Sequence, residues 1–246
     1  MTKASFHDAG RSEIAEGLPA GLYPVAVPIG NPLDITLRAV NVLRRCDTVI
    51  CEEYREGIRL LKALGIEKPL KQINEHTKSI EIRELFEELL IRKDKAVALI
   101  SDAGTPCFAD PGAELVRLCH EFGVAVYPVP GASSLMAALM ASGLKSDRFM
   151  YYGFLSAKKE ERQAELKQLK SQSGFDIVFL EAPYRLKSVL EDMKKLIGGK
   201  RSALLFYKLT TPRQQIISGS LEELSSQAES LPKGEFVLIL EHESHH

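Results

Sequence analysis

The chain of 246 residues carries 32 Lys and Arg against 33 Asp and Glu, for a formal net charge of −1, and 45% of its residues are hydrophobic. These values are typical of a globular protein and lack the basic excess of a dedicated nucleic-acid-binding module. No apolar run is long enough to span a bilayer, and residues 1–20 lack the apolar core of a signal peptide. We therefore expect a soluble cytoplasmic protein.

Cysteine and histidine patterns argue against a metal site. The four cysteines form no CxxC pair, and His242, His245 and His246 stand together in a polar tail, far along the chain from any cysteine. Buried thiols in a reducing compartment are the simpler interpretation, and no bound metal is expected.

In the first half of the chain, β-rich runs alternate with amphipathic helical patterns, which is typical of βαβ units around a mostly parallel sheet. The predicted strands are Leu22–Val27, Thr48–Cys51, Pro69–Ile73, Ala96–Ile100 and Val124–Val129. The predicted helices are Leu33–Arg44, Ile58–Leu64, Ser79–Arg92, Ala113–Phe122 and Ala132–Ser142. An α/β domain with a mostly parallel sheet follows.

The second half has a different order of elements, which predicts a second α/β domain with a mixed sheet. Its predicted strands are Phe149–Phe154, Asp176–Leu180, Ser202–Leu209, Gln215–Ser218 and Glu235–Leu240, and its helices are Ser156–Lys170, Tyr184–Ile197 and Leu221–Glu229. We place a loose extension at residues 1–20, the two domains at 21–145 and 146–241, and a tail at 242–246. The charged helix Ser156–Lys170 is interpreted as a solvated face in preference to a phosphate-binding patch.

Three loops of small residues follow predicted strands of the first domain. They are Pro28–Asn31, Ser101–Pro106 and Pro130–Ser134. One such loop would be an ordinary tight turn, but three at the carboxyl edge of a parallel sheet indicate a ligand site. The loops contain neither a GxGxxG fingerprint nor a Walker A lysine, so a dinucleotide or a triphosphate is not expected. A ligand with adenosine and no phosphate, such as S-adenosylmethionine (SAM), fits better.

An ordered set of motifs resembles the tetrapyrrole-methylase superfamily, and within it the ribosomal RNA small-subunit methyltransferase I family. The motifs run from about Leu22 to Leu240. They are Val27–Asn31, Asp34–Ala39, Ser101–Pro106, Asp110–Gly112, Pro130-Gly131 with Ser133, Gly153–Leu155, Glu181–Pro183 with Arg185, and Lys233–Val237. One motif alone would be weak evidence, whereas the ordered set is specific.

The resemblance implies a two-domain tetrapyrrole-methylase-like fold, a homodimer, and SAM held between the domains. It also implies methyl transfer to the ribose 2′-hydroxyl of a cytidine in 16S rRNA, with the 30S subunit as a partner. Carried over position by position, the cofactor-binding residues are Pro28, Ser101, Asp102, Ala103, Gly104, Thr105, Ser133, Ala182, Leu209 and Gly234.

Candidates for activating a ribose hydroxyl are acidic residues near these loops. Glu52 and Glu53 end the second strand, with Arg55 beside them to hold a phosphate. Both acids are equally well interpreted as helix N-terminal charges that complement the helix dipole. Asp102 is the better candidate, because a carboxylate in a glycine-flanked loop at a strand end has little structural role beyond a local turn. His76 is a polar loop residue that either shuttles a proton or has no role.

Two segments depart from the family pattern. Where the family reads Glu-Asp-Thr-Arg-His, this chain reads Glu52–Glu56 as Glu-Glu-Tyr-Arg-Glu. Where the family reads Arg-Glu-Leu-Thr-Lys and then His-Glu-Glu, this chain has Tyr207–Thr211, in which Lys208 replaces an acid, and then Arg213–Gln215. These changes concern the substrate more than the cofactor.

Three functions remain open at this point. The first is an rRNA ribose 2′-O-methyltransferase, which a basic rim around Lys158, Lys159, Arg162 and Lys208 would favour. The second is a SAM-dependent methylase of another RNA position or of a small molecule such as a tetrapyrrole, which a deep enclosing cleft would favour. The third is a SAM-binding ribosome-assembly protein without catalysis, supported only by the altered Tyr207–Gln215 segment.

Overall fold

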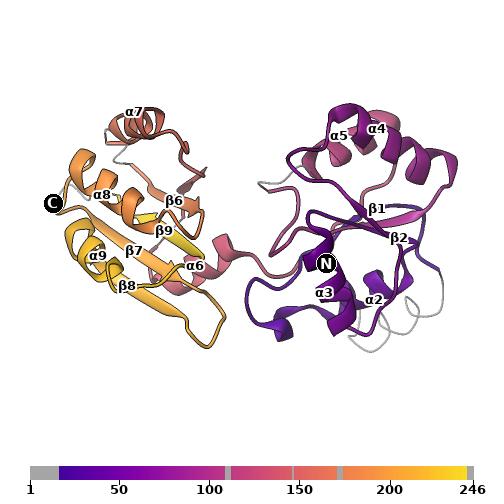
Figure 1. Cartoon of the computed structure of the whole chain (residues 1–246), viewed down its shortest axis with the longest axis horizontal. Coiled ribbons are helices and arrows are strands. Elements are labelled where there is room, and N and C mark those ends of the chain that lie inside the picture. Colours follow the sequence, from indigo (N-terminus) through magenta and orange to yellow (C-terminus); the bar gives the residue numbers. More distant parts are fainter. Residues whose placement is uncertain (1–16, 109–111, 146, 171–173, 243–246) are drawn as a thin grey trace. The chain divides into compact units, whose positions relative to one another are not determined.

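The computed structural model describes residues 17–108, 112–145, 147–170 and 174–242. The chain forms two compact units (Figure 1). The first unit comprises residues up to 28 together with 33–132, and the second comprises 29–32 together with residues from 133 onward. The division therefore falls at 132/133, whereas the sequence places it at 145/146. Of the sequence motifs, Asp110 and Pro111 lie outside the described residues.

The first unit is built on a parallel sheet of four strands in the order β1-β4-β2-β3. The strands are β1 (Gly21–Pro24), β2 (Thr48–Cys51), β3 (Leu70–Gln72) and β4 (Ala96–Leu99). Its helical elements are η1 (Pro32–Asp34, shared with the second unit), α2 (Leu37–Arg45), α3 (Tyr54–Ala63), α4 (Ser79–Phe86), the π-helical η2 (Glu87–Arg92) and α5 (Gly112–Phe122).

Helices cover both faces of this sheet, as expected for βαβ units (Figure 1). Side chains of β2 alternate between two cores: Val49 and Cys51 pack with α2 and α3, whereas Ile50 packs with α4 and α5. Each face therefore buries an apolar layer, and the loops at the strand ends are the parts left to bind ligands.

The predicted strand Val124–Val129 runs beside the first strand but forms only isolated bridges with it, not a continuous ladder. Its amides and carbonyls bond to the first strand at isolated points, with Val126 opposite Leu22 and Val129 opposite Val25. The amides of Leu22 and Ala26 donate to Ala125 and Val129, but Pro24 between them has no amide hydrogen to donate, so a continuous ladder is interrupted there.

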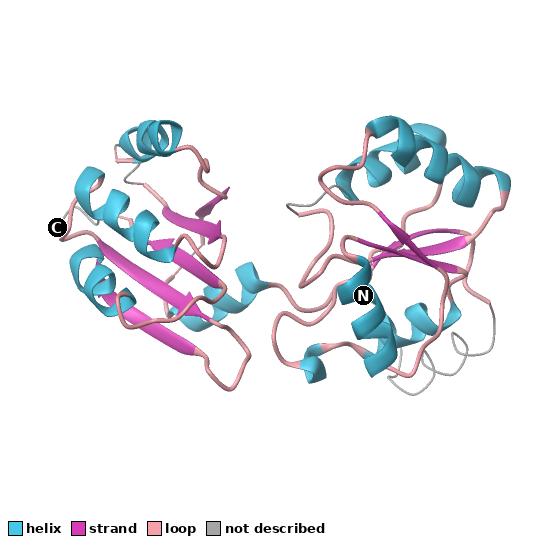
Figure 2. Cartoon of the chain, in the orientation of Figure 1, coloured by secondary structure: helices cyan, strands magenta, loops and turns pink. Residues whose placement is uncertain are grey.

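The second unit is built on a mixed sheet of five strands in the order β5-β6-β9-β7-β8 (Figure 2). The strands are β5 (Phe149–Gly153), β6 (Asp176–Glu181), β7 (Ser202–Tyr207), β8 (Gln215–Ser220) and β9 (Phe236–Leu240). β5 and β6 are parallel, and the other neighbours are antiparallel. The parallel first sheet and mixed second sheet confirm the predicted fold class.

The faces of the second sheet carry different helices. Helices α7 (Lys159–Leu169), α8 (Leu186–Leu196) and α9 (Leu221–Ala228) pack on one face around Phe179 and Leu205. Helix α6 (Ser134–Ser142) packs on the other face, through Leu135 and Ala138. Its apolar side is thus buried by the second unit, although it precedes the predicted domain boundary.

Among the described residues, no helix is long and apolar enough to span a membrane. His242, predicted to lie in a polar tail, follows β9 and its ring Nδ1 lies 3.0 Å from a carboxylate oxygen of Asp176. His245 and His246 lie outside the described residues.

Candidate functional site

The loop Ser101–Thr105 follows β4 and folds back onto the end of the first strand. Gly104 exchanges two backbone hydrogen bonds with Val27, of 2.9 and 3.1 Å. Gly104 has a φ of +79°, a conformation that glycine adopts without steric cost. Ser101 is buried and donates to the carbonyl of Ala103 at 3.2 Å, and Thr105 Oγ1 donates to Ala132 O at 3.1 Å. Hydrogen bonds within the loop and to Val27 and Ala132 therefore hold it beside Pro28.

Asp102 links this loop to helix α3. Its Oδ1 accepts a hydrogen bond of 3.0 Å from the amide of Glu53, which is the N-cap residue of α3. Partial burial raises the pKa of Asp102 above its ordinary value, and the charges of Glu53 and Glu56 raise it further, while the Glu53 hydrogen bond opposes them. Burial, with the charges of Asp102 and Glu53, also raises the pKa of Cys51 to about 11. This edge of the first unit is therefore locally negative.

The predicted catalytic residues Glu52, Glu53 and Arg55 lie where β2 passes into α3. The carbonyl of Glu52 accepts a 2.8 Å bond from the side-chain amide of Gln72, which ends β3. Glu53 makes no side-chain capping bond, so any contribution to the helix N-terminus is by charge alone. Arg55 lies in the first turn of α3 and is exposed. The contact made by Gln72 was not predicted from the sequence, because its partner is a backbone carbonyl, which every residue has.

A small cleft adjoins these residues. It has a volume of about 380 Å³ and is lined by Tyr54, Gln72, Thr77 and Glu81, among others. A larger cleft of about 690 Å³ lies between α3 and the residues that lead into β3, at the opposite end of that strand. The larger cleft is thus away from the loops.

The chemical character of the first unit's edge suits a cation-bearing nucleoside. The Ser101–Thr105 loop is built of small residues, of which Ala103 and Thr105 are exposed, and Asp102 adds an acceptor in acidic surroundings. SAM has a positive sulfonium and an ammonium group that suit this acceptor, whereas its carboxylate would need donors from other residues. Among the described residues, no cluster of three or more potential ligands could hold a metal ion.

The remaining predicted cofactor residues, Ser133, Ala182, Leu209 and Gly234, belong to the second unit. Leu209 is buried between two residues with left-handed backbone, Lys208 (φ +49°) and Thr210 (φ +62°). Such conformations are strained for non-glycine residues and concentrate at functional sites. Thr210 Oγ1 accepts a 2.9 Å hydrogen bond from the amide of Asn31, so the loop after β1 supports this turn.

Gly30 and Gly234 permit close backbone approach at this turn. A Cβ at Gly30 would lie 2.6 Å from the carbonyl oxygen of Leu209, and a Cβ at Gly234 would lie 2.7 Å from the Tyr207 ring. Ser133, in contrast, has a local structural role, since its hydroxyl caps α6 by accepting from the Met136 amide.

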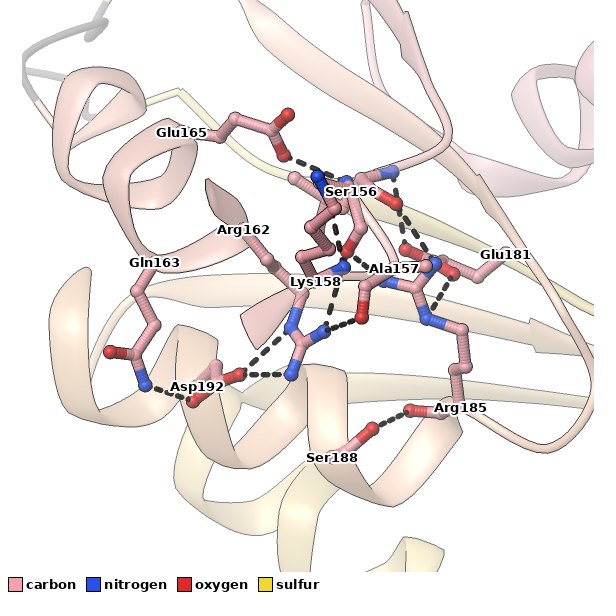
Figure 3. Close-up of polar contacts among 11 residues, drawn as sticks. Ser156, Ala157, Lys158, Arg162, Gln163, Glu165, Glu181, Arg185, Ser188 and Asp192 are labelled. Atoms are coloured by element: carbon pink, nitrogen blue, oxygen red, sulfur yellow. Dashed lines mark hydrogen bonds and ion pairs between the residues drawn. The ribbon is translucent and has the colours of Figure 1, made fainter. Parts of the chain in front are cut away.

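Buried charges hold the loop after β5 (Figure 3). Arg185 pairs with Glu181 and donates to the carbonyls of Leu155 and Ser156 at 2.9 and 2.7 Å. Arg162 pairs with Asp192 at 2.8 Å and donates to the carbonyl of Ser156 at 3.3 Å. Arg162 therefore points into the protein rather than into the solvated face or basic rim that the sequence suggested.

Comparisons with known proteins identify the family and the fold. A family model described as tetrapyrrole (corrin/porphyrin) methylases matches residues 21–225. The chain is 40% identical to ribosomal RNA small subunit methyltransferase I of Synechocystis, over 89% of this chain and 78% of that protein. It is 42% identical to the protein of the same name from Pseudomonas aeruginosa, with the same two coverages. The fold matches a crystal structure of diphthine synthase with a TM-score of 0.72 at 19% identity, covering 92% of this chain and 91% of that one.

Proposed function

Because this chain belongs to the tetrapyrrole methylase family, whose members are SAM-dependent methyltransferases, we propose that it methylates a cytidine ribose 2′-hydroxyl in small-subunit ribosomal RNA. The observation that carries the proposal is the identity of about 40% along 89% of the chain to proteins named ribosomal RNA small subunit methyltransferase I. We further propose that the enzyme acts in the cytoplasm as a homodimer.

The first unit's edge supplies the groups that such a reaction needs. SAM supplies an electrophilic methyl group on a sulfonium, so the protein has mainly to align a weak nucleophile and accept its proton. The small residues of Ser101–Thr105 leave room for the nucleoside, and Asp102 offers an acceptor for its cationic or hydroxyl groups. Ser133, Ala182, Leu209 and Gly234 remain predicted cofactor contacts.

Proton removal from the ribose hydroxyl falls to a carboxylate in this proposal. We assign this role to Asp102, whose raised pKa makes it a stronger base than an ordinary aspartate. As the new oxygen–carbon bond forms and the carbon–sulfur bond breaks, the hydroxyl proton passes to this carboxylate or to a water that it holds. Arg55, exposed in the first turn of α3, is the residue that we propose to contact a phosphate of the substrate.

The test is transfer of labelled methyl from SAM to 30S subunits taken from a strain that lacks the endogenous enzyme. Label that maps to a cytidine ribose is the expected result, and Asp102→Asn should lower kcat while 30S binding is retained. Label on a base, or on a tetrapyrrole acceptor assayed in parallel, would replace the proposed substrate. SAM binding with no transfer to any acceptor would instead favour a non-catalytic assembly protein.

A further inference from the structure

Four chain segments of the second unit meet at one edge of its sheet. β5 and β6 run parallel and both end there, with Gly153 paired to Phe179. β9 begins at this edge, since Phe236 pairs with Glu181, and β7 ends there, since Tyr207 also pairs with Phe236. The residues just beyond these strand ends are therefore neighbours in space.

Two large aromatic side chains lie exposed at this edge. Phe154 directly follows β5 and is 49% exposed, and Tyr184 follows β6 and is 68% exposed. Rings of this size normally bury most of their area in a core, and two exposed rings that follow neighbouring strands indicate an interaction surface. Neither ring contributes to the apolar cores on the two faces of the sheet.

The exposure of both rings is fixed by the backbone beside them. Leu155 is 1% exposed, its amide donates to Glu181 at 3.3 Å, and its carbonyl accepts from Arg185 at 2.9 Å. With Leu155 anchored in the core, Phe154 is turned outward. The amide of Arg185 also closes a turn onto the Ala182 carbonyl at 2.9 Å, and this turn carries Tyr184. One buried arginine thus orients both segments (Figure 3).

Positive charge lies beside one of the two rings and at a neighbouring strand end. Lys233 Nζ lies 5.4 Å from the centre of the Tyr184 ring, and Lys208, which follows β7, has its Nζ 5.2 Å from the centre of the buried Tyr207 ring. Within the part of the chain that the structure describes, neither lysine forms an ion pair. Of the acids at this edge, Glu235 is exposed, whereas Glu181 is buried against Arg185. The edge therefore combines exposed aromatic surface with two lysines that form no ion pair, beside one exposed carboxylate, that of Glu235.

We propose that Phe154 and Tyr184 form a stacking platform for unpaired bases of the RNA substrate, with Lys233 and Lys208 contacting its phosphates. The inference rests on the proposed function and deepens it. Aromatic rings interleaved with cations are how proteins hold single-stranded RNA, because every base has a face to stack and every linkage a charge. A ribose hydroxyl is reached most readily in a nucleotide that such a platform keeps out of a helix.

The experiment compares Phe154→Ala and Tyr184→Ala with the wild-type chain. Binding is measured with a short fluorescent single-stranded RNA and with its duplex, SAM affinity by calorimetry, and KM with 30S subunits. Each truncation should weaken single-strand binding by about tenfold. Duplex binding and SAM affinity should change little, and KM should rise more than kcat falls. Tyr184→Phe, which keeps the ring, should restore binding.

Two further variants separate stacking from charge and from general disturbance. Lys233→Gln should reduce the slope of log affinity against log salt concentration for the single strand by about 0.7, the value for one lost phosphate contact. Phe149→Ala removes a 37% exposed ring from the opposite end of β5 and should leave RNA binding unchanged. Melting temperatures show whether any variant fails to fold.

The possible failures are distinct. Unchanged RNA binding and KM in both alanine variants of an active enzyme would overturn the platform and leave the proposed function standing. A parallel loss of SAM affinity would assign the rings to the cofactor and also overturn it. If wild-type protein does not methylate 30S subunits, the proposed function fails, and ring-dependent binding of the single strand would still support the platform. If it binds no single strand either, both fail.

Discussion

The two sheet edges of this protein fix their loops in different ways. At the edge of the first unit, Ser101–Thr105 is held by backbone and hydroxyl hydrogen bonds, and Asp102 remains partly open to solvent. At the edge of the second unit, the loop after β5 is held by two arginines that are themselves buried and paired. The first edge therefore keeps the charge of Asp102 available for a ligand. The second edge uses its buried charges to hold the loop in place and exposes the aromatic rings of Phe154 and Tyr184 to solvent.

The largest expected effect is on the stability of the second unit. Arg162→Met leaves the buried carboxylate of Asp192 without its ionic partner and should lower the free energy of unfolding by about 3–5 kcal/mol. Urea denaturation followed by circular dichroism, with hydrogen exchange to locate the loss, would measure it. Lys158→Met removes an exposed ion pair with Glu161 from the same region and should have little effect. Equal losses in the two variants would show that burial of the arginine does not matter.

A second test concerns the close packing of the turn at Gly234. Gly234→Ala places a Cβ 2.7 Å from the Tyr207 ring, which is buried and whose hydroxyl is bonded to Pro232 O. Overpacking of this kind should lower the free energy of unfolding by about 1–3 kcal/mol, measured by the same denaturation. Gly174→Ala meets no atom within 4 Å and serves as the matched control. Similar stability of the two variants would mean that the turn adapts.

These tests address contacts that the sequence could not predict. The order of strands and helices and the parallel first sheet follow from local patterns, because apolar runs and glycine-rich turns are visible in short windows. The partner of a buried charge is not visible in this way. Arg162 stands in a highly charged helix, and its partner Asp192 is on another helix, so the pattern favoured a solvated face.

For the candidate site, too, the positions of the loops could be predicted from the sequence, but the contacts between distant residues could not. The loops at strand ends were located from small residues, and the contact between Asp102 and Glu53 required the neighbouring positions of β4 and β2 in the sheet. The exposure of Phe154 and Tyr184 was not predicted, because both stand beside apolar residues that do enter the core. The support of the Thr210 turn by Asn31 joins residues far apart in sequence and had no local signal.

A smaller effect is expected from the charge at the first edge. Asp102→Asn removes the negative charge that faces a cationic ligand and should weaken SAM binding by about 1–2 kcal/mol, measured by calorimetry. In the wild-type protein the affinity should fall as pH falls through the raised pKa of Asp102, because the protonated carboxyl no longer attracts a cation. The variant should lack this pH dependence. A wild-type affinity that is constant over acidic pH would place the SAM charge away from Asp102.

Unliganded stability should follow the opposite trend in the same pH range. The folded-state pKa of Asp102 lies above its ordinary value, so folding takes up a proton between the two. The contribution of this group to stability therefore rises as pH falls through that range and is lost as pH rises. The comparison of Asp102→Asn with wild type isolates it, and ligand binding and stability can then be separated by the sign of their pH dependence.

The smallest expected effect is on the rates at which the cysteines of the first unit are alkylated, which report how accessible this edge is to solvent. Burial raises the pKa values of Cys46, Cys51 and Cys119 to about 11, so these thiols should resist alkylation at neutral pH. Cys107 is only half-buried, just beyond the Ser101–Thr105 loop, and should react first, with SAM slowing it. Mass spectrometry of iodoacetamide-treated protein would show the order. The charges of Asp102 and Glu53 act on the Cys51 thiol. Early modification of Cys51 would therefore mean that the contact between Asp102 and Glu53 opens readily. In that case the bound ligand, and not the hydrogen bonds of the protein itself, would keep this edge of the first unit closed.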